Sequence, residues 1–377
     1  MTGQNRTYLD WNATAPLRPE ARAAMLGALD ATGNPSSVHG EGRAARRLIE
    51  DARDQVAALV GARPPDVIFT SGATEANNTV IRSGWLSVFA ADIEHDSVLA
   101  PLRAADVLHA QLPVGADGVV GLGQLDERLG QSADTAHATL VTLQLANNET
   151  GVLQPVSALA AIARAHGVRV HSDVTQAIGR IAVDMSALGV DYVSLSSHKI
   201  GGPKGAGALV VREGAPVSPL ITGGGQERRY RAGTENVAAI AGFGAAARAV
   251  MAVAADMPRV AALRCRLEAN VISATPGARI IGHEVLRLAN TSCIALPGRS
   301  AEMLVTALDL AGIAVSAGAA CSSGKIAASH VLTAMGLGLE IARSAIRISI
   351  GPTTTDDDIT AFLAAWTNIT RHLAKAA

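Results

Sequence analysis

The sequence predicts an α/β protein built on a large, mainly parallel sheet, with a second, smaller unit of the α+β type. Short apolar strands alternate with Ala-rich helical stretches through much of the chain. Strands separated by helices need crossover connections, so neighbouring strands should run parallel with helices on both faces of the sheet. A chain of 377 residues is long enough for one large domain and one smaller one.

The elements of the large sheet are expected over residues 60–215. They are, in chain order, a strand at 65–70, a helix from residue 74, a strand at 138–145, a helix at 157–167, and strands at 168–173, 190–199 and 207–213. In sheets of this kind ligands bind at the carboxyl ends of the strands. Polar residues directly after these strands are therefore the first candidates for a functional site.

The second unit is expected to follow the Gly-rich segment ITGGGQERRYRAGTEN. One long Ala-rich helix should run from Val237 through Leu267 and lead into it. Its expected elements are strands at 291–297 and 345–351, a helix at 300–312 and a loop of small residues at 316–324. We expect a large domain at residues 14–256 and a small domain formed by residues 1–13 and 257–377.

Composition argues against several classes of partner. The net charge is -1, no basic run stands out and aromatic residues make up 3% of the chain, so no nucleic-acid surface is indicated. No stretch resembles a membrane-spanning helix or a signal peptide, so we expect a soluble, cytoplasmic protein. Three cysteines without a C-x-x-C pair indicate neither a disulfide framework nor a metal site of the protein's own.

Lys199 is the first candidate for chemistry. It ends an expected strand and is one of four lysines among 32 basic residues, the others being Lys204, Lys325 and Lys375. Where Arg supplies most of the positive charge, a retained Lys favours a role that needs an amine able to lose its proton. Such an amine forms a Schiff base with an aldehyde cofactor, although an exposed lysine before a turn is an equally good interpretation of this segment alone.

Other polar residues follow the neighbouring strands. Asp173, with Gln176 three residues on, can pair with a protonated pyridine nitrogen or cap the next helix. The backbone amides of Ala73 and Thr74, between a strand and a helix, suit a phosphate. His95, also between a strand and a helix, can stack on a flat ring or serve as a structural residue.

Three further residues complete the candidates, Asn147, Arg347 and Cys321. The Asn147 amide can bond a phenolic oxygen or a substrate carboxylate, or belong to a turn, whereas Arg347 in an apolar strand favours binding of an anion. Cys321 lies among small residues, where its thiol can act as a nucleophile. Cys265 and Cys293, in a helix and a strand, are expected to be buried.

A set of motifs, in order along nearly the whole chain, resembles the cysteine desulfurases of the NifS/IscS type. The motifs are YLDWNATAP, GNPSSVHGEG, FTSGATEANN, EHDSVL, NNETG, HSDVTQAIG, SSHKIGGPKG, GGGQERRYRAGTEN, SAGAACSSGK, SHVLTAMG and SAIRISIG. The resemblance identifies the chain as a member of the class-V aminotransferase-like superfamily. It implies fold type I of the enzymes that use pyridoxal 5'-phosphate (PLP).

The resemblance also implies an activity and a role for each candidate. Lys199 would hold PLP as a Schiff base, and Cys321 would take sulfur from L-cysteine as a persulfide, leaving L-alanine. The residues that would hold the cofactor are His95 on the ring, Asp173 at the pyridine nitrogen, Gln176 at the ring oxygen, and Ala73, Thr74, Ser196 and His198 at the phosphate. Asn147 and Arg347 would hold the substrate carboxylate, and Thr234 would reach the phosphate of a neighbouring subunit, which implies an obligate homodimer.

Two positions depart from the family pattern. Trp11 stands where the start usually resembles YLDNAAT or YLDNNAT, and GGPKG replaces the commoner YGPKG. SAGAACSSGK resembles the cysteine loop of the NifS/IscS group and lacks the RxGHHCA pattern of the SufS group. The sulfur acceptor implied is an iron-sulfur scaffold protein, with which Cys321 could share a transient cluster, or another acceptor protein.

Other functions stay open at this point. One is another class-V PLP enzyme, such as a selenocysteine lyase, a small-amino-acid aminotransferase or a kynureninase-like hydrolase, in which Cys321 would be incidental. Another is a catalytically idle scaffold that binds sulfur-transfer partners. Substitution of Cys321 separates the first alternative from a desulfurase, and absence of a lysine-bound cofactor would favour the second.

Overall fold

The computed structural model describes residues 6–105, 107–318 and 328–375, within which the strands form three sheets. The large sheet has the order β2-β8-β7-β6-β5-β3-β4, with β2 (Val67–Thr70), β3 (Ser87–Ala91), β4 (Leu108–Leu112), β5 (Thr139–Thr142), β6 (Arg169–Asp173), β7 (Tyr192–Ser196) and β8 (Gly207–Val211). The second sheet has the order β12-β13-β10-β9, with β9 (Arg279–Ile281), β10 (Thr291–Ala295), β12 (Ser316–Ala317) and β13 (Ala345–Ser349). The third pairs β1 (Thr7–Tyr8) with β11 (Ile313–Ala314).

Helices account for most of the remaining described residues. The α-helices are α1 (Pro19–Leu29), α2 (Gly40–Leu59), α3 (Ala73–Ile81), α4 (Asp96–Ala104), α5 (Leu125–Gly130), α6 (Val156–Ala165), α7 (Met185–Leu188), α8 (Val237–Val250), α9 (Met257–Ala274), α10 (Ala301–Leu310), α11 (His330–Ala334), α12 (Leu339–Ser344) and α13 (Asp356–Lys375). Short 3-10 turns are η1 (Pro64–Asp66), η2 (Ala133–Ala138), η3 (Ser197–Ile200), η4 (Gln226–Arg229) and η5 (Met251–Asp256). None of the helices described is both long and apolar enough to cross a membrane.

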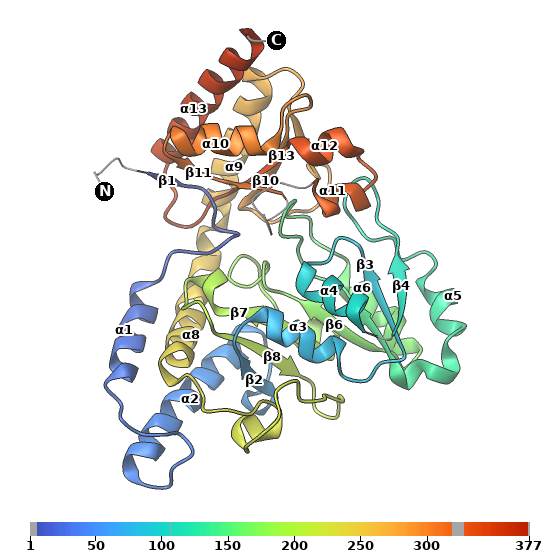
Figure 1. Cartoon of the computed structure of the whole chain (residues 1–377), viewed down its shortest axis with the longest axis vertical. Helices are drawn as coiled ribbons and strands as arrows, with labels where there is room; N and C mark the ends of the chain where they lie inside the picture. Colours follow the sequence, from blue (N-terminus) through green and yellow to red (C-terminus); the bar gives the residue numbers. More distant parts are fainter. Residues whose placement is uncertain (1–5, 106, 319–327, 376–377) are drawn as a thin grey trace.

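The large sheet is mainly parallel, and helices cover both of its faces (Figure 1). Strands β7, β6, β5, β3 and β4 pair in parallel, and β8 lies antiparallel between β7 and β2. Side chains alternate along β3: Phe89 and Ala91 join the core that also holds residues of α2, α6 and α8, while Val88 and Ala90 join the core with residues of α3 and α4. The predicted α/β fold is confirmed.

The single long helix expected from Val237 through Leu267 is two helices, which corrects that prediction. Helix α8 ends at Val250, α9 begins at Met257, and η5 separates them. Pro258 in the first turn of α9 explains the break, because proline has no N–H to donate and its ring clashes with the carbonyl four residues before it. Helix α8 packs on α1 and α2, whereas α9 packs on α13.

The second sheet and the C-terminal helices enclose a core that also contains part of the N-terminal segment. Leu9 is buried in this core with Leu304, Ile348 and Trp366. In Figure 1 β1 lies beside these elements, above the large sheet. The chain then leaves β1, passes between the two sheets and continues into α1 on the large unit. Residues 10–14 therefore lie where the two units meet.

A buried ion pair fixes η4 to the large unit. The two Nη atoms of Arg53 in α2 each donate to the Glu227 carboxylate at 2.8 Å, and both side chains are 1% exposed. Glu227 also accepts from the backbone N–H of Phe69, at 2.9 Å. Residues 227–229 have φ values of 42°, 54° and 71°, a left-handed conformation that side chains disfavour. The ion pair thus holds a strained turn in place.

Replacing Arg53 by Met should destabilise the fold strongly, because the Glu227 carboxylate would stay buried without its partner. We expect the free energy of unfolding to fall by about 3–5 kcal/mol, measured by urea denaturation at a fixed protein concentration. The control is Arg266→Met, which removes a surface ion pair with Asp356 and should cost less than about 1 kcal/mol. Equal losses in the two variants would contradict the importance of the buried pair.

Candidate active site

A cavity of about 550 Å³ lies at the carboxyl ends of the parallel strands. This is where parallel sheets place their ligand sites, because the loops that follow the strands converge there. Eight of the twelve residues predicted for the site line the cavity: Ala73, Thr74, His95, Asp173, Gln176, Ser196, His198 and Lys199. The fold therefore brings together residues from four segments that are distant in the sequence.

Lys199 lies in η3, directly after β7, with its amine in the cavity wall. Its Nζ donates to the backbone carbonyl oxygen of Asn12 and, at 3.0 Å, to that of Ala13. Burial, together with the nearby guanidinium groups of Arg347 and Arg180, lowers the pKa of Lys199 to about 7. A large fraction of this amine is thus uncharged near neutral pH and able to act as a nucleophile or a base.

A carboxylate and an imidazole in the cavity wall are joined by a hydrogen-bond network. Asp173 accepts from Asn77 Nδ2 at 2.8 Å and from the backbone N–H of Thr175 at 2.9 Å. Asn77 Nδ2 also donates to Ser97 Oγ, and the N–H of Ser97 donates to His95 Nδ1 at 3.0 Å. Burial lowers the pKa of His95, so its ring is held neutral with the proton on Nε2. Both groups are fixed before any ligand arrives.

The opposite end of the cavity suits an anion. Helix α3 begins at Ala73, and the backbone N–H groups of its first turn, including that of Thr74, have no partner within the helix. Ser196 and His198 line the same cavity, and Ser196 Oγ lies beside Gly72, the residue that precedes this helix. Burial and the neighbouring lysines lower the pKa of His198 to about 4, so its imidazole is neutral and can donate to an anion without adding charge.

These groups fit PLP. A reactive amine, a fixed carboxylate and a helix start surround one cavity, and they match the aldehyde, the pyridine nitrogen and the phosphate of that molecule. Two cavity-lining side chains, Asn148 and Thr175, also carry buried atoms, Oδ1 and Oγ1, with no hydrogen-bond partner among the described residues. Buried polar atoms are normally paired, so these two indicate that the cavity holds a polar ligand.

Comparison with known proteins agrees with this chemistry. A model of the class-V aminotransferase family matches residues 7–362. The chain belongs to the class-V aminotransferase family. It is 43% identical over 366 residues to a cysteine desulfurase from Cereibacter sphaeroides, covering 94% of this chain and 93% of the relative. It is 38% identical to the cysteine desulfurase IscS of Dictyoglomus turgidum, covering 94% and 92%.

Solved structures give the same result. A NifS-like protein from Rickettsia africae has a TM-score of 0.91 and 37% sequence identity, covering 97% of this chain and 100% of that one. Within the class-V aminotransferase family the chain is therefore NifS/IscS-like, as its motifs indicated. The fold, a mostly parallel sheet with a smaller antiparallel one, is the fold of these PLP enzymes.

The structure corrects the expectation for Asn147. Its side chain is 1% exposed and serves the backbone: Nδ2 donates to the carbonyl of Ile93 at 3.1 Å, and Oδ1 accepts from the N–H groups of Glu149 and Thr150 at 2.9 Å. Asn147 does not line the cavity, whereas Asn148 does. Both asparagines follow β5, and the turn alone decides which one faces the ligand.

Two other predicted residues, Arg347 and Thr234, do not line the cavity. Arg347 in β13 donates to Asp10 Oδ1 at 2.8 Å and to the carbonyl of Asn148 at 3.1 Å, and its buried Nε has no partner among the residues described. Thr234 is exposed and does not line the cavity of its own chain. Cys321 lies outside the described residues.

The other two cysteines differ from each other. Cys293 in β10 is fully buried, as expected, and burial raises its pKa, so it remains a thiol. Cys265 lies in helix α9, but it is exposed, which corrects the expectation that it is buried. The amphipathic pattern of α9 accounts for the difference, because its buried positions are Val260, Leu263, Leu267 and Val271.

Sequence reasoning missed two residues that hold the site together, Asn12 and Arg180. Arg180 Nη1 donates to the backbone carbonyl of Gln176, and Asn12 contacts both Lys199 and Gln176. Asn12 follows no strand of the large sheet, and Arg180 lies in the segment after β6 but not directly at the end of that strand. The rule that located the other candidates therefore does not reach them. The only available signal for Asn12 was its place beside Trp11, in a motif that departs from the family pattern.

The pKa of Lys199 can be tested by labelling the full chain with a small aldehyde and borohydride, without added cofactor. The charged amine does not react, so modification of Lys199 should rise with pH around a midpoint of about 7. Peptide mass analysis measures the modified fraction at each pH. In the urea-unfolded chain the midpoint should lie near the ordinary value of 10.5. The same high midpoint in the folded chain would contradict the effect of burial.

Proposed function

We propose that this chain converts L-cysteine to L-alanine with PLP as cofactor and holds the removed sulfur as a persulfide on Cys321. The observation that carries the proposal is the buried amine of Lys199, with its pKa lowered to about 7, in a cavity that also presents a fixed carboxylate and a helix start. The chain is a NifS/IscS-like cysteine desulfurase by similarity over nearly its full length. This similarity supports L-cysteine as the substrate.

We assign the cofactor contacts by chemistry. Asp173 would hold the ring nitrogen, Gln176 the ring oxygen, and the imidazole of His95 would lie against the ring. The phosphate would be held by Ala73, Thr74, Ser196 and His198. When bound through Lys199, PLP supplies an electron sink for the bonding electrons of the substrate's α-carbon.

Side chains of this chain would then bind substrate and move protons. Nε of Arg347 and the amide of Asn148 would donate to the substrate carboxylate, which orients the Cα–H bond towards Lys199. The uncharged Nζ of Lys199 would take the α-proton, and this role needs the lowered pKa. His95, neutral in the folded chain, could pass a proton through its Nε2.

Sulfur transfer would form one bond and break another. The Cys321 thiolate attacks the substrate sulfur, an S–S bond forms, and the bond between sulfur and Cβ breaks with its electron pair left on carbon. A proton delivered to Cβ completes alanine. Cysteine and the enzyme thiol thus become alanine and the enzyme persulfide, with no other oxidant or reductant.

Two partners belong to the same proposal. A second copy of the chain would place its exposed Thr234 at the phosphate, and exposed apolar side chains before, within and after α1, at Leu17, Leu29 and Val38, support a homodimer. The persulfide would pass, in the cytoplasm, to an iron-sulfur scaffold protein or another acceptor of sulfur.

Incubation with L-cysteine should add one sulfur atom to the peptide that contains Cys321, detected by mass analysis without reductant. Cys321→Ala should abolish this adduct and slow alanine formation by at least about a hundredfold, because the nucleophile is lost. Cys265→Ala is the matched control and should behave as wild type, because Cys265 lies on the outer face of α9. Alanine formation at the wild-type rate in Cys321→Ala would instead favour a selenocysteine lyase or another class-V PLP enzyme.

The two adjacent asparagines offer a second test of the site. Asn148→Ala should raise KM for cysteine about tenfold and leave stability nearly unchanged, because one hydrogen bond to a charged group is lost. Asn147→Ala should instead lower the free energy of unfolding by about 2–3 kcal/mol, because backbone groups of its turn lose their partners. Alanine-formation kinetics and urea denaturation give the two readouts. A reversed pattern would contradict the roles assigned.

A further inference from the structure

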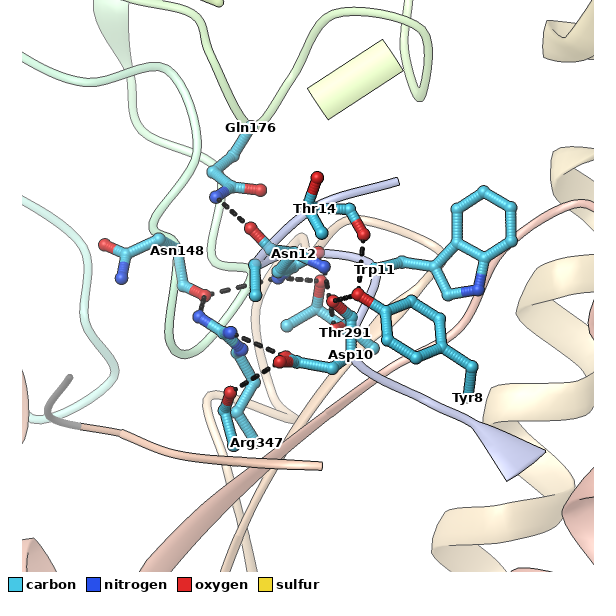
Figure 2. Close-up of polar contacts among 12 residues, drawn as sticks. Tyr8, Asp10, Trp11, Asn12, Thr14, Asn148, Gln176, Thr291 and Arg347 are labelled. Atoms are coloured by element: carbon cyan, nitrogen blue, oxygen red, sulfur yellow. Dashed lines mark hydrogen bonds and ion pairs between the residues drawn. The ribbon is translucent and has the colours of Figure 1, made fainter. Parts of the chain in front are cut away.

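The N-terminal segment between β1 and α1 forms a polar network at the junction of the two units. Figure 2 shows side chains and carbonyls from the large unit, Asn148 and Gln176, meeting those from the second unit, Thr291 and Arg347, around Asn12. Asn12 is 0% exposed. None of the roles in the proposed reaction accounts for a fully buried asparagine at this point.

The side chain of Asn12 is held from both units. Its Nδ2 donates to Thr291 Oγ1 at 3.0 Å and to the backbone carbonyl of Asn148 at 3.2 Å. Its Oδ1 accepts from Asn290 Nδ2 at 3.0 Å, and its backbone N–H donates to Ser349 Oγ at 2.9 Å. Both amide protons and the carbonyl oxygen of this side chain are thus used, which leaves its orientation no freedom.

The backbone carbonyl of Asn12 points the other way, towards the cavity wall. It accepts from Gln176 Nε2 at 3.1 Å and from Lys199 Nζ, while the next carbonyl, that of Ala13, accepts from Lys199 at 3.0 Å. One carbonyl oxygen therefore receives both the reactive amine and the amide that lines the cavity beside it. Its position is set by the side-chain contacts of the same residue.

We propose that Asn12 is a positioning residue: its side chain, locked to Thr291, Asn290 and Asn148, fixes the carbonyl that orients Lys199 and Gln176. The inference deepens the proposed function and rests on it. Asn12 would then link β10 to the Lys199 amine, because its side chain bonds to Thr291 in β10 and its carbonyl accepts from Lys199. A loss of this contact should disturb the amine without removing any group that touches the cofactor.

Among the described residues, the hydrogen bonds of the Lys199 amine go to the backbone carbonyls of Asn12 and Ala13, which makes the Asn12 carbonyl important. The charged groups that face Lys199 are Arg347 from β13, Arg180 after β6, Asp173 at the end of β6 and Asp10 from the N-terminal segment, and the titratable neutral groups near it are His95 and His198. The two guanidinium groups disfavour the ammonium form, and the two carboxylates favour it. The carbonyls of Asn12 and Ala13 accept hydrogen bonds from the amine, so displacing them should weaken the ammonium form further.

The experiment compares Asn12→Ala and Thr291→Val with the control Thr275→Val. Thr291→Val removes the acceptor for Asn12 Nδ2, whereas Thr275→Val removes a hydrogen bond of similar burial, from Trp366 Nε1 at 2.8 Å, that does not involve Asn12. The two threonine variants are therefore matched in chemistry and in expected cost. If Asn12→Ala does not fold, Thr291→Val still tests the inference.

Two quantities are measured on the full chain after removal of cofactor. The first is the affinity for added PLP, at a pH about two units above the pKa of Lys199, where the amine is uncharged in every variant. It should fall about tenfold in Asn12→Ala and about threefold in Thr291→Val, and change less than about twofold in Thr275→Val. The second is the pH profile of the borohydride-trapped pyridoxyl adduct on Lys199. Its midpoint should move to lower pH in the first two variants and stay in the third.

The outcomes separate this inference from the proposed function. Wild type that forms no pyridoxyl adduct on Lys199 would overturn the proposed function itself. An adduct in wild type, with the affinity and pH midpoint unchanged in both Asn12→Ala and Thr291→Val, would overturn only the positioning role. Equal changes in Thr275→Val would also overturn it, because they would show a general loss of stability rather than an effect through Asn12.

Discussion

The proposed chemistry of this protein depends on a lysine amine, that of Lys199, which is buried at the carboxyl end of a parallel sheet. Burial makes the ammonium form costly and frees the amine for reaction near neutral pH, with a pKa of about 7 for Lys199. A fold that buries such a group must also supply acceptors for it, since a buried amine without partners would destabilise the chain. Here the acceptors are two main-chain carbonyls from a segment that is distant in sequence, at Asn12 and Ala13.

Burial also affects the acidic side chains near the site. Burial raises the pKa of Glu94 to about 8 and that of Glu149 to about 7, so near neutral pH these two carboxyl groups, each next in sequence to a cavity-lining residue, carry less than their full negative charge. Asp173, in contrast, is held by two hydrogen-bond donors, a side chain and a backbone N–H. It is thus the cavity-lining carboxylate built to meet a positive group.

The sequence was sufficient for the architecture and for residues that directly follow strands. Strand periodicity located β5, β6, β7 and β8 within a few residues, and the end-of-strand rule led to Asp173 and Lys199. It could not choose between Asn147 and Asn148, because adjacent residues differ only in the direction a turn gives them. It also joined α8 to α9, because helical periodicity on both sides of η5 outweighed the signal of a single proline, Pro258.

Residues such as Asn12 lie beyond sequence reasoning for a different reason. Their partners come from β10, β13 and the turn after β5, so their role exists only once two units have packed together. The same packing explains why the N-terminal segment belongs to two environments at once, with Leu9 in the core of the second unit and the Asn12 carbonyl bonded to Lys199 in the cavity wall. A segment anchored in one unit and bonded to the Lys199 amine of the other would make the proposed chemistry of the large sheet depend on the docking of the small one.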